Sequence, residues 1–278
     1  MEKCIQNLRS QSPLIHCLTN YVTANDCANL LLACGASPIM GDAEEEVEEI
    51  TQLSDGLLLN MGTPKNRTLP VMLKAGKRAN ELGHPVVFDP VGVGVSAFRR
   101  NIANGLMNGV HFQVIRGNLS EIKFLAGLCA SFKGVDAGQE ERLTSDKIED
   151  LLPFLQSFAE NRQAVIVVSG EVDLVCDGGK AYAIRAGHPL MAKVTGTGCM
   201  LSALITAYVT ANSSHSLLAT VAAVCAMGLA GEKAALRMSN QEGSNSFRCY
   251  LIDAISQMTP KDFALGSEME RLLSRIRI

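Results

Sequence analysis

Short apolar runs rich in Val, Ile and Leu alternate along the chain with longer segments of helical periodicity. The runs that fit buried strands are 13–18, 36–40, 56–60, 85–90, 112–117 and 164–170. Strands buried on both faces read as continuous apolar runs, and a parallel strand is reached through a crossover that is usually a helix. The alternation therefore predicts an α/β fold with a mostly parallel sheet covered by helices.

The remaining segments complete this picture. Two further strands, DLVCDG and KAYAIR, are predicted to form a hairpin around 177–179. No low-complexity linker, clear repeat or shift of composition marks a boundary, so we expect residues 1–278 to form one domain. The acidic run DAEEEVEEI at 42–50 has the spacing of a solvent-facing helix rather than of a metal site. Helical patterns occupy about 23–34, 68–82, 120–129, 145–160, 199–212, 216–237 and 246–257.

The composition bounds the class of protein and its partners. Of the 278 residues, 47% are hydrophobic and 19% are charged, and the formal net charge is -3. These values fit a soluble globular protein. The sequence shows no basic patch that would indicate a nucleic-acid partner. The first 20 residues contain no apolar stretch before a small-residue cleavage site, and no run elsewhere reaches the 18 or so apolar residues that span a bilayer. We therefore expect a cytoplasmic protein with no membrane partner.

The cysteines are scattered rather than paired. There are nine of them, an odd number, and no two are spaced as Cys-x-x-Cys. Disulfide frameworks and zinc sites both use regular cysteine spacings, so most of these residues are predicted to be free thiols in the core. They are Cys4, Cys17, Cys27, Cys34, Cys129, Cys176, Cys199, Cys225 and Cys249.

Polar and small residues gather where the predicted strands end. In an open α/β sheet the ligand binds beyond the carboxyl ends of the strands, so this clustering is the strongest sign of an active site that the residues give by themselves. The residues concerned are Thr19, Asn20, Met40, Gly41, Asn60, Asp89, Arg116, Asn118, Ser169 and Gly170.

The segment VTGTGCM, residues 194–200, brings two glycines to the start of a predicted helix. Gly196 and Gly198 permit a tight turn and a close approach, so the amides at 196–199 can converge on an anion such as a phosphate. The helix dipole also lowers the pKa of a nearby thiol. Cys199 is therefore either a reactive group or a small residue in a packed corner. The glycines form either an anion site or a structural turn before a buried helix.

Two further motifs place a polar group at the end of a strand. In RGNLSEI, Arg116 can grip a phosphate and Asn118 can hold polar ligands, although Asn118 followed by Glu121 also fits a capping box. In VVFDPVGVG, an apolar strand ends on Asp89, which either serves a turn or holds a ligand. Together Asp89 and Glu121 can bind Mg²⁺ through water and substrate phosphates, because this ion keeps several of its waters.

The common glycine motifs for nucleotides are missing from the sequence. It contains no G-x-x-x-x-G-K-[ST] segment and no G-x-G-x-x-G after a strand, so a nucleotide would bind by another scheme. His16 and His188 are candidates for acid–base work, but each is more often a packed or surface histidine. A Cys–His hydrolase would need a histidine that the fold brings beside Cys199.

The chain closely resembles the hydroxyethylthiazole kinases of thiamin salvage, in one register over nearly its whole length. This resemblance implies a three-layer α/β/α ribokinase-like fold. It also implies phosphorylation of the primary alcohol of 4-methyl-5-(2-hydroxyethyl)thiazole with ATP and Mg²⁺. The segments that carry it are LIHCLTNYVTANDCAN, CGASPIMGDA, LLLNMGT, PVVFDPVGVG, VIRGNLSEI, VVSGEVDLV and VTGTGCMLSALI.

The resemblance implies roles for residues around the acceptor alcohol. Gly196, Thr197 and Gly198 would form the anion hole for the transferred phosphoryl group. Met40 and the backbone at Gly196 would contact the thiazole. Cys199 would stand at the position of the catalytic base, where ribokinase-like enzymes usually carry an aspartate after Gly-x-Gly and where thiazole kinases also show cysteine.

It implies roles for residues around the nucleotide as well. Arg116, Asn118 and Ser169 would contact ATP. Asp89 and Glu121 would organise the magnesium ion.

Ribokinases commonly close over their substrate with a small β-sheet lid, whereas this chain shows no inserted run of strands in its first 50 residues. We therefore expect no separate lid domain. Members of the resembled family are trimers with thiazole sites between subunits, so by resemblance a homotrimer would supply the missing wall. Two other functions stay open: an ATP-dependent dehydratase of damaged nicotinamide cofactors, which shares the fold, and a thiazole sensor without catalysis.

Overall fold

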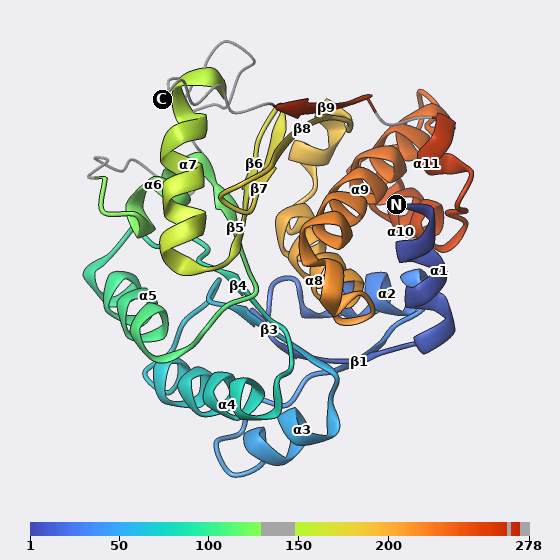
Figure 1. Cartoon of the computed structure of the whole chain (residues 1–278). Helices are drawn as coiled ribbons and strands as arrows, with labels where there is room; N and C mark the ends of the chain where they lie inside the picture. The colour runs from blue at the N-terminus through green and yellow to red at the C-terminus, as the bar shows by residue number, and fades with distance from the viewer. Residues whose placement is uncertain (129–147, 266–267, 273–278) are drawn as a thin grey trace.

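Nine strands form a single sheet in the part of the chain that the computed structural model describes, residues 1–128, 148–265 and 268–272 (Figure 1). The strand order is β2-β1-β3-β4-β5-β6-β7-β8-β9. The first six strands of this order run parallel, and each of the last three runs antiparallel to its neighbour. The strands are β1 Leu14–Leu18, β2 Ser37–Ile39, β3 Gly56–Asn60, β4 Val86–Asp89, β5 Val114–Asn118, β6 Val165–Ser169, β7 Asp173–Cys176, β8 Ala181–Arg185 and β9 Glu268–Leu272.

Helices cover both faces of the sheet, which gives the three layers expected from the sequence (Figure 1). On one side lie α1, α2, α8, α9 and α10, and on the other lie α3 to α7. The helices are α1 Glu2–Gln11, α2 Ala24–Cys34, α3 Val47–Leu53, α4 Thr68–Leu82, α5 Ala97–Gly109, α6 Leu119–Leu125, α7 Ile148–Arg162, α8 Thr197–Thr210, α9 Ser216–Arg237, α10 Ser244–Ser256 and α11 Asp262–Leu265, with 3-10 turns η3 Pro189–Lys193 and η4 Ser213–His215.

Two hydrophobic cores lie against the two faces. Successive side chains of a strand point to opposite faces. Accordingly Leu58 of β3 packs into the core that contains α8 and α9, whereas Leu57 and Leu59 pack into the core that contains α4 and α5. All three are fully buried, which is why the strands read as unbroken apolar runs.

The predicted elements are present, with ends displaced by a few residues, but several others were not expected. These are the helices α1, α5 and α11, the strand β9 and the 3-10 turns η3 and η4. Helix α5 escapes a search for helix formers because it contains glycines. One of them, Gly105, packs closely against α4, since a Cβ there would lie 2.8 Å from Leu69 Cδ1. The acidic run is also helical only from Val47 onward. Residue 129 of one predicted helix and residues 145–147 of another lie outside the described residues.

The thiols and the longest helix both lie in the core. No disulfide joins the described cysteines, and all of them except Cys249 are buried, while Cys129 lies outside the described residues. The segment Ser213–Arg237 is by length and composition long and apolar enough to cross a membrane, contrary to our expectation that no run reaches about 18 apolar residues. Of its most apolar window 72% is buried inside the protein, which is typical of a core helix.

Candidate active site

A hydrogen-bonded chain of polar side chains crosses the carboxyl ends of β1, β3 and β4. Asn20 Nδ2 donates to Asn60 Oδ1 at 3.0 Å, and Asn60 Nδ2 donates to Asp89 Oδ2 at 2.8 Å. Ser202 of α8 donates to the same Asp89 oxygen at 2.7 Å. Asn60 and Asp89 are paired residues of adjacent parallel strands, so the strand ends predicted to meet do meet. Ser202 escaped the sequence analysis, although its place three residues after Cys199 puts it on the same helix face.

The start of α8 places Cys199 at the end of this chain. Gly196 is the residue that caps the helix, with a φ of 87°, and a Cβ there would lie 2.4 Å from Thr23 Cγ2. The turn therefore requires glycine. The first amides of a helix have no partner within it, so the amides of the first turn are available to an anion. Asn20 Nδ2 contacts Cys199 Sγ at 3.4 Å.

The Cys199 thiol is not acidified as the helix start alone suggests. Its side chain is buried, and burial raises its pKa above the ordinary value, with the charge of Asp89 acting in the same direction. The polar groups of Thr23 and Asn60 and the charge of Arg116 act to lower the pKa but do not offset these two effects. The expectation of a lowered pKa was therefore wrong, and the resting group is a thiol at neutral pH.

Arg116 lies between the anion site and the strand ends. Its Nη2 donates to Ser169 Oγ at 2.5 Å, and its Nη1 lies 3.6 Å from Asp89 Oδ2. A Cβ built on Gly198 would lie 2.6 Å from Arg116 Nη1, so the guanidinium sits against the backbone of the α8 start. The glycine thus permits a close approach of positive charge to the free amides.

Two buried carboxylates lie near this guanidinium. Burial raises the pKa of Glu121 to about 7, with the charge of Asp89 as the second cause, and burial also raises the pKa of Asp89. Glu121 accepts hydrogen bonds from the amides of Gly92 at 2.7 Å and Asn118 at 2.8 Å. The capping box between Asn118 and Glu121 is present, so the structural reading of that motif is confirmed.

Asp89 and Glu121 could hold a magnesium ion, because one buried carboxylate oxygen has no partner among the described residues. Asp89 Oδ1 is buried and has no hydrogen-bond partner within the described chain, so one acceptor remains for a cation or its water. In the same part of the chain no group of three or more His, Cys, Asp or Glu side chains gathers to hold a metal by itself. The donor set therefore suits an ion that keeps waters and shares substrate phosphates.

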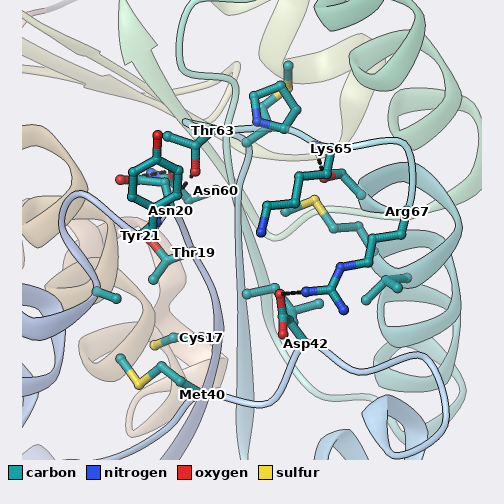
Figure 2. Close-up of a pocket in the computed structure, with 17 residues that line it drawn as sticks. Cys17, Thr19, Asn20, Tyr21, Met40, Asp42, Asn60, Thr63, Lys65 and Arg67 are labelled. Atoms are coloured by element: carbon teal, nitrogen blue, oxygen red, sulfur yellow. Dashed lines mark hydrogen bonds and ion pairs between the residues drawn. The ribbon is translucent and has the colours of Figure 1, made fainter.

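A cavity of about 230 Å³ opens on the outer side of the polar chain (Figure 2). Asn20 and Asn60 line it, and Met40 lies at its rim with 39% of its surface exposed. Figure 2 shows Lys65 and Arg67 reaching into it from the opposite side. The sequence analysis missed both cations, because the loop after β3 has neither periodicity nor a recognisable motif.

The two histidines are engaged elsewhere. The buried His16 ring lies 3.0 Å from Thr51 Oγ1 and 2.8 Å from the Gly41 carbonyl, and burial lowers its pKa. His188 Nδ1 accepts a hydrogen bond from the amide of Leu190. No hydrogen bond joins either ring to Cys199 in the described residues, which disfavours a Cys–His hydrolase.

Residues 5–261 match the model of the Hydroxyethylthiazole kinase family. The chain belongs to this family. It is 51% identical over 255 residues to the hydroxyethylthiazole kinase of Clostridium acetobutylicum. This alignment covers 92% of this chain and 93% of that protein. A solved hydroxyethylthiazole kinase from Pyrococcus horikoshii OT3 superposes with a TM-score of 0.84 at 34% identity over 98% of both chains.

A more distant structure indicates the wider fold class. A ribokinase-like superfamily protein from Enterococcus faecalis V583 superposes with a TM-score of 0.60 at 12% identity, over 92% of this chain and 89% of that one. This likeness concerns the fold alone. The ribokinase-like architecture expected from the sequence is confirmed.

Proposed function

We propose that this chain transfers the γ-phosphoryl group of ATP to the hydroxyl of 4-methyl-5-(2-hydroxyethyl)thiazole, giving the thiazole phosphate and ADP in thiamin salvage. Its membership of the hydroxyethylthiazole kinases supports this assignment. The observation that carries it in the structure is one contact. Asn20 lines the cavity and also contacts Cys199 Sγ beside the free amides of α8, so the cavity and the anion site meet there.

The anion site suits the transferred phosphoryl group. In a loose transition state the charge is spread over three equatorial oxygens, and catalysis depends on positioning and on charge stabilisation. The backbone of Gly196, Thr197 and Gly198 supplies amide donors, and Arg116 supplies a cation against that backbone. We propose that Arg116, Asn118 and Ser169 contact the nucleotide, and that Met40 and the backbone of Gly196 contact the thiazole.

Cys199 stands where a base would receive the hydroxyl proton. Because its pKa is raised, the resting thiol serves first to hydrogen-bond the alcohol and orient it. To act as a base, Cys199 must first release its thiol proton to solvent; the thiolate then takes the hydroxyl proton as the alcohol oxygen bonds to the γ-phosphorus and ADP leaves. The charge of Arg116 opposes the pKa rise and so favours the thiolate. A transition state that asks little of a base is compatible with this arrangement.

Asp89 and Glu121 are the residues that would hold Mg²⁺. When bound, this ion would neutralise charge on the phosphates of ATP. Different donors hold the two carboxylates in place. Asn60 and Ser202 donate to one oxygen of Asp89, and two backbone amides hold Glu121.

We further propose a homotrimer with the sites between subunits, in which residues 1–278 act as one kinase domain in the cytoplasm without membrane or nucleic-acid partners. The cavity wall supports the shared site, because Tyr21 and Met40 line the cavity yet are 76% and 39% exposed. Light scattering should give a mass near three chains. Dilution below the dissociation range should lower the specific activity, and a fully active monomer would contradict the shared site.

An ADP-release screen tests the function. Thiazole, pyrimidine and sugar alcohols are compared with hydrated nicotinamide cofactor, each with ATP and Mg²⁺. We expect ADP release that depends on the thiazole alcohol and far exceeds the release with the others. Release only with the hydrated cofactor would favour the dehydratase, and thiazole binding without any ADP release would favour a sensor.

A further inference from the structure

Arg99 ties together two loops that border the site. It lies on α5 and donates three hydrogen bonds to main-chain carbonyls of the loops after β3 and β4. The acceptors are Met61 at 2.9 Å, Gly62 at 2.7 Å and Val91 at 2.7 Å.

The Arg99 guanidinium donates its hydrogen bonds to these carbonyls rather than to a carboxylate within the described residues. The side chain is half-buried, and burial lowers its pKa. No ion pair joins it to a carboxylate in the described part of the chain, although the charge of Glu121 is felt there. Burying a cation is unfavourable unless its donors are satisfied. A planar guanidinium can reach several acceptors at fixed angles, which an ammonium cannot.

The first tied loop faces the acceptor side of the site. The Gly62 amide donates to Asn60 Oδ1 at 3.0 Å. A Cβ on Gly62 would lie 2.7 Å from Asn20 Nδ2, so this backbone lies directly against Asn20. Asn20 in turn contacts Cys199 Sγ. A shift of this loop is therefore transmitted to Cys199.

The second tied loop faces the carboxylates. The Gly92 amide donates to Glu121 Oε1 at 2.7 Å, and a Cβ on Gly92 would lie 3.4 Å from Arg99 Nη1. The two loops also meet directly, because the Met61 amide donates to the Asp89 carbonyl at 3.2 Å. Arg99 is thus placed to fix both halves of the site relative to each other.

We propose that Arg99 is a positioning residue of the phosphoryl transfer, which sets the loop at Met61 and Gly62 against the loop at Val91 and Gly92. The inference rests on the proposed function. It adds a residue that acts through the main chain of the two loops and belongs to none of the motifs found in the sequence.

Arg99→Ala, Arg99→Lys and the control Arg100→Ala test it. Arg100 is the next residue of α5, is also half-buried, and donates to one carbonyl, that of Gly94, at 3.2 Å. We expect Arg99→Ala to lower kcat about 10-fold or more and to raise KM for the thiazole alcohol, with partial recovery in Arg99→Lys. The control should stay within about 2-fold. Rates are expressed per folded enzyme, from the unfolding transition of each variant.

Hydrogen exchange gives a readout that does not need activity. In Arg99→Ala the amides of Gly62 and Gly92 should exchange about 10-fold faster than in Arg100→Ala, while amides in the central strand β4 stay protected. Unchanged exchange at both glycines would overturn the proposal, as would kinetic constants equal to those of the control. If the Ala variant fails to fold, Arg99→Lys decides by the same comparison. A wild-type enzyme without activity would refute the proposed function. The exchange experiment would still test whether Arg99 holds the loops at Gly62 and Gly92 in place.

Discussion

Replacing Glu121 with Gln should remove a pH-dependent cost of folding. The folded carboxyl has a pKa of about 7 against an ordinary value of 4.5, because burial and the charge of Asp89 disfavour its ionised form. The folded state therefore holds a proton that the unfolded state releases. Stability from this group is present below pH 4.5 and is lost as the pH rises towards 7.

The size of the effect follows from the two pKa values. Each pH unit between them costs about 1.4 kcal/mol, so the wild-type free energy of unfolding should fall by about 3 kcal/mol across this window relative to Glu121→Gln. Gln retains the capping position but offers one oxygen instead of two to the amides of Gly92 and Asn118. The lost hydrogen bond costs about 1 kcal/mol at every pH and leaves the slope unchanged.

Urea unfolding at fixed protein concentration in Mg²⁺-free buffer, from pH 5 to 8, measures this slope. Glu45→Gln is the control, because it removes the same charge from an exposed position. The wild type and the control should both lose stability with rising pH relative to Glu121→Gln. Parallel curves for all three proteins would refute the assignment of a raised pKa to Glu121.

Three further substitutions probe the proposed roles at the strand ends and the α8 start. Arg116→Ala should raise KM for ATP and leave the affinity for the thiazole alcohol nearly intact by calorimetry; equal weakening of both would remove it from the nucleotide site. Asp89→Asn should lower kcat and raise the Mg²⁺ concentration for half-maximal rate, because an amide lacks the charge that would hold the ion and its waters; an unchanged magnesium titration would contradict this. Gly198→Ala should lower kcat about 10-fold or more, because its methyl group displaces the Arg116 guanidinium; wild-type kinetics would show that the close approach is unimportant.

The strand ends could be predicted because their signal is local. An unbroken apolar run that ends on Asn60 or Asp89 marks a buried parallel strand and its carboxyl edge, and parallel neighbours bring such ends together. The glycines at 196 and 198 likewise predict a close approach of other groups to the backbone, which a side chain at either position would prevent.

The missed features depend on contacts between distant segments. Nothing near Arg99 in sequence shows that α5 packs where its guanidinium meets the loop at Met61. The pKa of Cys199 is raised because the fold buries it near Asp89, 110 positions earlier in the chain. The local sequence shows that Cys199 lies at a helix start, but it does not show the burial and the nearby charge of Asp89 that raise the pKa.

Phosphorus NMR of reactions with ATP, Mg²⁺ and the thiazole alcohol tests the central claim, that the alcohol is phosphorylated beside Cys199. The wild type should form thiazole phosphate in equal amount to ADP. Cys199→Ala should be slower by about 10²-fold or more, the usual worth of general-base help, and Cys199→Asp should retain activity because a carboxylate can take the same proton. A fast Ala variant beside an inactive, unstable Asp variant would mark Cys199 as a packing residue. Wild-type enzyme that forms no phosphate ester of the thiazole alcohol would contradict the account as a whole.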